Sequence, residues 1–257
     1  MFPSHDRPDN AYTRFFKKQS QFPKFKKKSN RQSFQYPQGV NIKDNKIYLP
    51  KIGWVKYFNS RDFEGQIKTV TVSKTPSGKY FVSVLVDTPQ EKLNKKEKDE
   101  KTAVGLDFGI KDLVITSDGE LFENQKHFQE MKSKLRVAQR SLSRKQKGSN
   151  NWHKQRLKVA KLYEKISNQR KDYLHKISKQ LVDEYNTICI EDLSVEGMLK
   201  EKKMSSLIAD ASWRTLRTYL EYKCDWYGKN LIVIGRFEPS SKRCNICGVI
   251  VTGKHRL

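Results

Sequence analysis

The sequence has no long apolar run. Nowhere in its 257 residues do apolar side chains continue for the ~20 positions that a membrane-spanning helix requires. Its opening residues, MFPSHDRPDN, lack the apolar segment of a secretory signal peptide. These two absences argue against a membrane protein and against a secreted one, so we expect a cytoplasmic protein.

Cysteine is also scarce, with four residues in the whole chain. Four thiols in a reducing compartment do not build a disulfide framework, and we expect metal ligands or packing residues instead. Cys189 and Cys224 lie in apolar patterns that are typical of buried packing residues. Cys244 and Cys247 are spaced as C-x-x-C with a glycine behind them, which is the usual first half of a zinc ribbon.

The second half of that zinc site is missing from the sequence. A tetrahedral zinc site needs four ligands, and no cysteine follows Cys247. His255 is a candidate third ligand, but a lone histidine there is usually a surface residue. We therefore expect a half site that binds zinc weakly or not at all in the monomer.

Acidic residues are few relative to basic ones. The 28 Asp and Glu stand against 52 Lys and Arg, which gives a formal net charge of +24. An excess of this size, with aromatic residues among the bases, predicts a polyanionic partner. Nucleic acid is the strongest candidate, because neutralised phosphates release counterions and give tight, salt-dependent binding. A highly charged surface without a dedicated partner is the alternative.

The first hundred residues divide into three segments. Residues 1–40 form a basic arm with four prolines and with aromatic residues between the lysines, and they either lie on a nucleic acid or are disordered. Residues 41–90 carry short β-branched and aromatic runs with a TPSG turn, which predict a small antiparallel sheet or partial β-barrel. Residues 91–102 are highly charged and glycine-free, as expected of a surface linker.

Residues 103–239 predict an α/β domain. Three short strands come first, followed by a helical hairpin over 126–182 that KGSNN interrupts. A buried strand over 186–193, an amphipathic helix over 205–227 that Gly228 ends, and a last strand in NLIVIGRF complete the pattern. Strands alternating with helices in this order are typical of an α/β fold.

The hairpin is almost entirely basic between its apolar positions. It contains three acids, Glu130, Glu164 and Asp172. A solvated helix face usually mixes charges of both signs, so this composition favours contact with a phosphate backbone. The side chains that we expect to bind nucleic acid are Arg136, Arg140, Arg144, Lys145, Lys154, Arg156, Lys161, Arg170 and Lys171.

Two acidic residues each end an apolar strand. Asp107 follows AVGL and Glu191 follows TICI. Two carboxylates on neighbouring strand ends repel one another, and divalent cations relieve that repulsion in sites that hydrolyse phosphodiesters. Asp192 is adjacent to Glu191, but its side chain should point to the opposite face of the strand. Strand-terminal acids are common, so a purely structural role for each is the alternative to a metal-dependent nuclease.

Several segments, in the right order from about Ala11 to Gly248, closely resemble TnpB. This family comprises RNA-guided nucleases encoded by bacterial and archaeal insertion sequences, formerly described as OrfB transposases and related to type V CRISPR effectors. The segments that carry the resemblance are VGLDFGIKDLVITSDGE, NQRKDYLHKIS, ICIEDLSVEGM, IADASWRTLRTYLEYKCDWYGKNLIVI and FEPSSKRCNICG.

The resemblance implies an RNase H-like (RuvC) domain with inserted basic helices after residue 102. A partial wedge-like β-barrel would precede it, the arm 1–40 would be a remnant of a recognition lobe, and 240–257 would be half of a zinc ribbon. Asp107 and Glu191 would be the first two catalytic carboxylates and would bind magnesium. The basic helices would contact a guide RNA–DNA heteroduplex, which makes DNA and guide RNA the expected partners of a monomer.

The sequence departs from this family in two places. GVIVTGKHRL after Cys247 contains neither the second C-x-x-C nor the acidic motif that bears the third catalytic aspartate. The opening strand and most of the recognition lobe are missing before NAYTRFF. We therefore expect an RNA-guided DNA endonuclease relative, truncated at both ends, that cleaves poorly because one catalytic acid is missing. A nuclease-dead RNA- or DNA-binding protein that acts as a repressor, or a decayed gene fragment, is the alternative.

Overall fold

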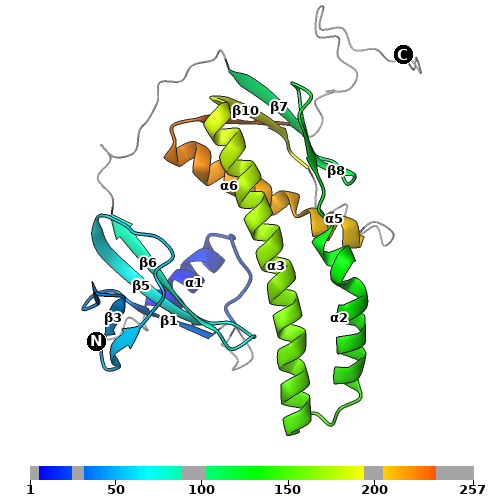
Figure 1. Cartoon of the computed structure of the whole chain (residues 1–257). Helices are drawn as coiled ribbons and strands as arrows, with labels where there is room; N and C mark the ends of the chain where they lie inside the picture. Colours follow the sequence, from blue (N-terminus) through cyan, green and yellow to red (C-terminus); the bar gives the residue numbers. More distant parts are fainter. Residues whose placement is uncertain (1–5, 25–31, 88–101, 194–204, 236–257) are drawn as a thin grey trace, which may run out of the picture. The chain divides into compact units, whose positions relative to one another are not determined.

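The computed structural model describes most of the chain and combines helices with three separate sheets (Figure 1). The described residues are 6–24, 32–87, 102–193 and 205–235. They belong to two compact units, Met1–Lys92 with Ser141–Lys161 and Leu93–Arg140 with Leu162–Leu257. Within these described residues, no helix combines the length and apolar character that crossing a bilayer would require.

The first unit contains two small antiparallel sheets. One has the order β1–β5–β6 and the other the order β2–β3–β4. The TPSG turn joins β5 to β6, and Gly78 adopts there a φ of 91° that favours glycine. The elements between Met1 and Lys92 are α1 (Asp6–Phe16), β1 (Gln32–Tyr36), β2 (Asn41–Lys43), β3 (Lys46–Leu49), β4 (Gly53–Lys56), β5 (Gln66–Lys74) and β6 (Tyr80–Asp87). The other segment of this unit, Ser141–Lys161, is part of the predicted helical hairpin.

The two small sheets share one apolar core. Alternate residues of the strands point inward, as the period of two requires. The buried side chains of this core are Tyr36, Ile47, Leu49, Val70 and Val72. Residues on the opposite faces of the same strands are mostly exposed, which leaves polar and aromatic side chains on the outside.

The second unit is built on a five-stranded mixed sheet with the order β11–β10–β7–β8–β9. The strands β7, β10 and β11 run parallel, whereas β8 and β9 pair antiparallel. The three strands and the hairpin expected after residue 102 are therefore present. The strand bounds are β7 (Ala103–Asp107), β8 (Asp112–Thr116), β9 (Leu121–Glu123), β10 (Thr187–Glu191) and β11 (Asn230–Ile234).

Two long helices form the hairpin that the sequence predicts. α2 (His127–Ser143) and α3 (Asn150–Glu184) lie side by side in opposite directions (Figure 1). The turn between them contains Gly148 at a φ of 88°. The second half of α3 packs on the sheet, and Leu174, Ile177 and Leu181 are buried there with the strand residues Ile188 and Ile190.

The helix expected over 205–227 is in fact two helices. Ser212 adopts a left-handed backbone conformation, with φ 54° and ψ 38°, and it separates α5 (Ser205–Ala211) from α6 (Trp213–Trp226). A non-glycine residue in this region interrupts the α-helical hydrogen-bond pattern. α6 ends as predicted at Gly228, where the Lys229 amide donates to the Cys224 carbonyl at 2.8 Å and closes a Schellman motif.

Candidate functional site

Asp107 and Glu191 end two neighbouring parallel strands at the same edge of the sheet. The register between β7 and β10 pairs Ala103 with Thr187 and continues to Leu106 with Ile190. Asp107 and Glu191 are the next residue of each strand. Because adjacent strands lie ~4.8 Å apart, this register places the two carboxylates beside each other, as the sequence predicts.

Both carboxylates line one cleft of about 290 Å³. Asp107 is exposed and Glu191 is half-buried. The remaining wall is made mostly of apolar and small side chains: Gly105, Leu106, Ile115, Thr116, Ser117, Cys189, Ile190 and Ile234. The cleft therefore concentrates its negative charge at the carboxyl ends of β7 and β10.

Gly109 fixes the direction of the chain just after Asp107. A Cβ at this position would lie 2.6 Å from the backbone carbonyl oxygen of Asp112, closer than real Cβ atoms approach. The Gly109 amide also donates to the Leu113 carbonyl at 3.3 Å. Glycine is thus required for the turn that lets Asp107 leave the sheet into the cleft.

Asp192 is held away from the cleft, as its position next to Glu191 predicts. Its Oδ1 accepts a hydrogen bond from Nη1 of Arg217 on α6 at 2.7 Å, and its amide donates to the Ile234 carbonyl at 3.1 Å. Arg217 Nε also donates to Glu221 at 2.9 Å. The contacts with Glu221 and then Asp192 raise the pKa of the Arg217 guanidinium. Sequence reasoning missed Arg217, although its i,i+4 spacing to Glu221 is a recognisable signal.

The residues of the cleft fit magnesium as part of a site. Magnesium is usually held by one or two carboxylates, together with waters and substrate phosphates, and the cleft supplies two. Within the part of the chain that the structure describes, no three His, Cys, Asp or Glu side chains gather as metal ligands. The predicted zinc half site, Cys244 and Cys247, and the candidate His255 lie outside the described residues.

Most of the nine basic side chains predicted to bind nucleic acid are exposed on the hairpin. Lys145 is half-buried, and Arg156 lies 5.9 Å from the ring centre of Trp152. The exposed side chains are Arg136, Arg140, Arg144, Lys154, Arg156, Lys161 and Lys171. A phosphate backbone can reach them without rearrangement of the fold.

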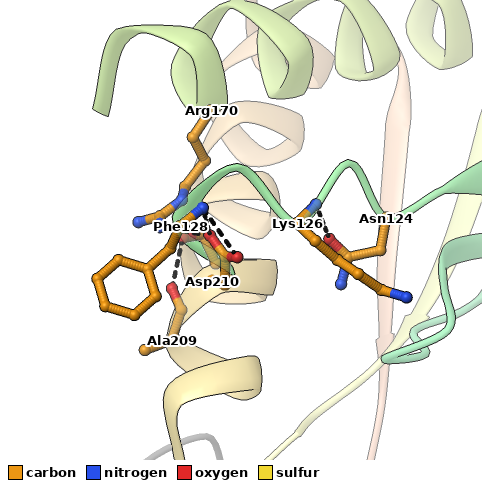
Figure 2. A network of polar contacts seen from close by, with 7 residues as sticks. Asn124, Lys126, Phe128, Arg170, Ala209 and Asp210 are labelled. Atoms are coloured by element: carbon orange, nitrogen blue, oxygen red, sulfur yellow. Dashed lines mark hydrogen bonds and ion pairs between the residues drawn. The ribbon is translucent and has the colours of Figure 1, made fainter. Parts of the chain in front are cut away.

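Arg170 differs from the other eight because it contacts a buried acid of the protein itself. Its Nη2 donates to Oδ1 of Asp210 at 2.7 Å (Figure 2). Asp210 is 5% exposed, and its two oxygens also accept from the Phe128 amide at 3.1 Å each. Asp210 therefore joins α5, α3 and the first turn of α2, where the helix dipole favours a negative charge.

Comparisons with known proteins point in one direction. A family model described as "Probable transposase" (OrfB_IS605) matches residues 81–202, and a model of the Cas12f1-like TNB domain matches residues 213–257. A relative from Streptomyces pristinaespiralis, named "Putative RNA-guided DNA endonuclease", is 40% identical over 93% of this chain and 60% of its own length. The Escherichia coli K12 protein InsQ, with the same description, is 37% identical over 93% of this chain and 63% of its own.

A solved structure shows that the fold is shared more widely. The Cas12f1 chain of a Cas12f1–sgRNA–target DNA complex matches with a TM-score of 0.55 at 14% identity, covering 96% of this chain and 63% of that one. The chain spans 60% of the length of the Streptomyces pristinaespiralis relative and 63% of the length of InsQ. At this identity the likeness to Cas12f1 concerns the fold alone.

Proposed function

Because the chain belongs to the TnpB family, we propose that it binds a guide RNA and target DNA and carries part of a magnesium-dependent endonuclease site. The observation that carries the proposal is the pairing of Asp107 and Glu191 at one sheet edge, in one cleft. Two relatives bear names that describe RNA-guided DNA endonucleases. The mixed sheet with its parallel strands β7 and β10 supports a RuvC-like, RNase H-like identity for this domain.

The roles of the chain's own residues follow from their positions. Asp107 and Glu191 would hold magnesium, which supplies charge stabilisation and a reactive water for phosphodiester hydrolysis. The strands fix both carboxylates in place, so little reorganisation is needed when a substrate binds. Arg217 holds the neighbouring Asp192 on the helix side of the sheet, which keeps a third charge from entering the cleft there.

We further propose that a polypeptide of these 257 residues cleaves DNA poorly. Its described cleft supplies two carboxylates, while the family resemblance implies three. Losses at such coupled catalytic groups are severe and far from additive. The test is a magnesium-dependent cleavage assay with the guide RNA, comparing the polypeptide with its Asp107→Asn variant. Robust cleavage by the unaltered polypeptide, lost in the variant, would contradict the proposed deficiency and support an active site of two acids.

We propose that the helical hairpin contacts the guide RNA–DNA heteroduplex through its exposed Lys and Arg side chains. The strong excess of basic over acidic side chains on α2 and α3 favours phosphates over an uncharged ligand. Nucleic-acid binding without cleavage, as in a repressor, is a second candidate function. The hairpin favours it because binding through its Lys and Arg side chains does not require the carboxylate cleft.

Salt titration separates a phosphate contact from other binding on the hairpin. A heteroduplex should bind with an affinity that falls steeply with salt, and replacing Arg140 and Arg144 with Gln should flatten that dependence by about one unit of slope for each phosphate that is no longer neutralised. Replacing Lys68 and Lys79, exposed lysines of β5 and the β5–β6 turn, with Gln provides a matched control that should leave the slope unchanged. If the Arg140/Arg144 variant binds the heteroduplex as tightly as the unaltered chain at every salt concentration, the hairpin assignment is overturned.

A further inference from the structure

The small sheet β2–β3–β4 presents a polar face with two distinct rows of side chains. The strand register places Lys43 opposite Lys46, and Lys46 opposite Lys56. Two residues further along each strand, the same register places Asn41 opposite Tyr48, and Tyr48 opposite Trp54. All six side chains are exposed. Because cross-strand partners share one face, a row of three lysines lies directly beside a row of Asn, Tyr and Trp.

The lysine row is unfavourable for the sheet by itself. Like charges directly opposite one another on neighbouring strands destabilise a sheet. From Asn41 to Lys56 the sequence contains a single acid, Asp44, in the turn between β2 and β3. The fold gains nothing visible from these charges, since Ile47 and Leu49 on the opposite face supply the buried contacts of β3. An anionic ligand would offset the repulsion.

The aromatic row offers flat surfaces for stacking. The rings of Tyr48 and Trp54 have centroids 5.5 Å apart and planes tilted by 60°. Tyr48 remains 37% exposed and Trp54 51% exposed, although aromatic side chains stabilise a protein most when buried. Exposed rings beside positive charges are the combination with which proteins bind single-stranded nucleic acid, because bases stack on rings while lysines contact phosphates.

We propose that this face, made of Asn41, Lys43, Lys46, Tyr48, Trp54 and Lys56, binds a single-stranded segment of RNA. Bases inside a duplex are already stacked on one another and offer no free face to a ring, so the ligand is unpaired. This inference rests on the RNA partner of the proposed function: loops and ends of an RNA present unpaired bases from the start, whereas target DNA offers a single strand only after the guide has displaced it. Asn41 adds an amide that can donate to and accept from a base edge or a 2′-hydroxyl.

Removing the rings tests the stacking contact. The probe is a short fluorescein-labelled single-stranded RNA of mixed sequence, titrated against the 257-residue chain by fluorescence anisotropy. Trp54→Ala should weaken binding about tenfold, with Tyr48→Ala somewhat less, because one base–ring stack is worth ~1–3 kcal/mol. Trp54→Phe keeps a ring and should restore most of the affinity. Trp226→Ala is the matched control, because Trp226 is similarly exposed (55%) but belongs to α6 of the other unit.

Replacing the lysines tests two points separately: whether they contact phosphates, and whether their mutual repulsion destabilises the sheet. The triple change of Lys43, Lys46 and Lys56 to Gln should lower the slope of log affinity against log salt by about two, at ~0.7 per phosphate contact on a single strand. The same variant should unfold at a higher urea concentration than the unaltered chain when no RNA is present, because the cross-strand repulsion is gone. A row with only a structural role would show the opposite change in stability.

The outcomes separate this inference from the proposed function. If the unaltered chain does not bind RNA at all, the proposed function fails. If the chain binds RNA but Tyr48→Ala and Trp54→Ala match Trp226→Ala, the hairpin binds RNA and the sheet face does not, so this inference is overturned. It is also overturned if the ring variants lose affinity for single-stranded DNA of the same sequence and keep their affinity for RNA. A duplex RNA probe should be insensitive to either ring.

Discussion

Two carboxylate sites in the second unit differ in what surrounds them. Asp210 is buried and accepts hydrogen bonds from Arg170 and the Phe128 amide, so the fold itself satisfies its charge (Figure 2). Asp107 and Glu191 lie beside each other at the carboxyl ends of two neighbouring strands and line a cleft. A buried acid that is bonded to a cation stabilises the fold, whereas two neighbouring acids that line a cleft can accept a cation. The following variants test this distinction between a closed and an open site.

The closed site should show the largest effect on stability. Asp210→Ala leaves the half-buried Arg170 guanidinium and the first turn of α2 without their acceptor, and we expect a loss of about 3 kcal/mol in the free energy of unfolding. Urea denaturation followed by circular dichroism measures it. Asp172→Ala is the control, because Asp172 forms an exposed i,i+4 pair with Lys176 and should cost ~0.5 kcal/mol or less. Similar losses in both variants would show that the contacts of Asp210 do not hold α2, α3 and α5 together.

The same contrast explains what the sequence can and cannot predict. Asp107 and Glu191 were predictable because each follows an apolar strand, and strand pairing at one edge then brings them together. Arg170 is one of many bases in a basic helix, and nothing local distinguishes it. Its role depends on Asp210, 40 residues away, and sequence spacing carries no information about such a contact.

The break at Ser212 escaped prediction for a related reason. Its left-handed conformation has no glycine or proline to announce it, and the apolar periodicity continues from α5 into α6. Gly228, in contrast, was a readable signal because a Schellman motif favours glycine at that position. A helix end can be predicted from sequence when its backbone conformation requires glycine. It cannot be predicted when another residue, such as Ser212, adopts the left-handed conformation.

Lys223 is a buried cation that contrasts with Asp210. Asp210 is bonded to a positively charged partner, whereas the two acceptors of Lys223 are uncharged oxygens. Lys223 is 7% exposed, and its ammonium donates to the His175 carbonyl at 2.8 Å and to Ser178 Oγ at 2.7 Å. Burial lowers the pKa of Lys223. We expect Lys223→Met to raise the free energy of unfolding by about 1 kcal/mol at neutral pH, because replacing buried charge by a side chain of similar volume is often stabilising.

The pH dependence of this gain provides the check on its cause. The folded protein releases the Lys223 proton at a lower pH than the unfolded chain, whose lysine has a pKa of 10.5. The unfolded state therefore binds more protons in the interval below 10.5, and the stability of the unaltered protein rises with pH there. The advantage of Lys223→Met should shrink as pH approaches 10.5. An advantage that does not change with pH would mean that packing, and not charge, is responsible.

The ion pairs of Arg217 are less buried than the Arg170–Asp210 pair. Losing them should therefore lower the free energy of unfolding by less than losing Asp210 does. The Arg217 pairs with Asp192 and Glu221 are about one third exposed on the arginine side, so solvent screens them. Arg217→Ala should lower the free energy of unfolding by ~1 kcal/mol or less. Arg217→Lys keeps the charge but not the two-pronged donor geometry, and should recover only part of that loss. Full recovery by lysine would reduce the role of Arg217 to simple charge attraction.

The open site should show the smallest change in stability and the clearest response to metal. Asp107→Asn removes one of two neighbouring charges at an exposed position, so we expect the free energy of unfolding to stay within ~0.5 kcal/mol of the unaltered protein or to rise slightly. Manganese, used as a magnesium substitute, should raise the thermal midpoint of the unaltered chain, because a ligand that binds only the folded state stabilises it. The shift should vanish in Asp107→Asn and in Glu191→Gln, yet persist in Asp172→Ala. A shift that survives loss of either strand-end carboxylate would place the cation elsewhere and remove the distinction between the two sites.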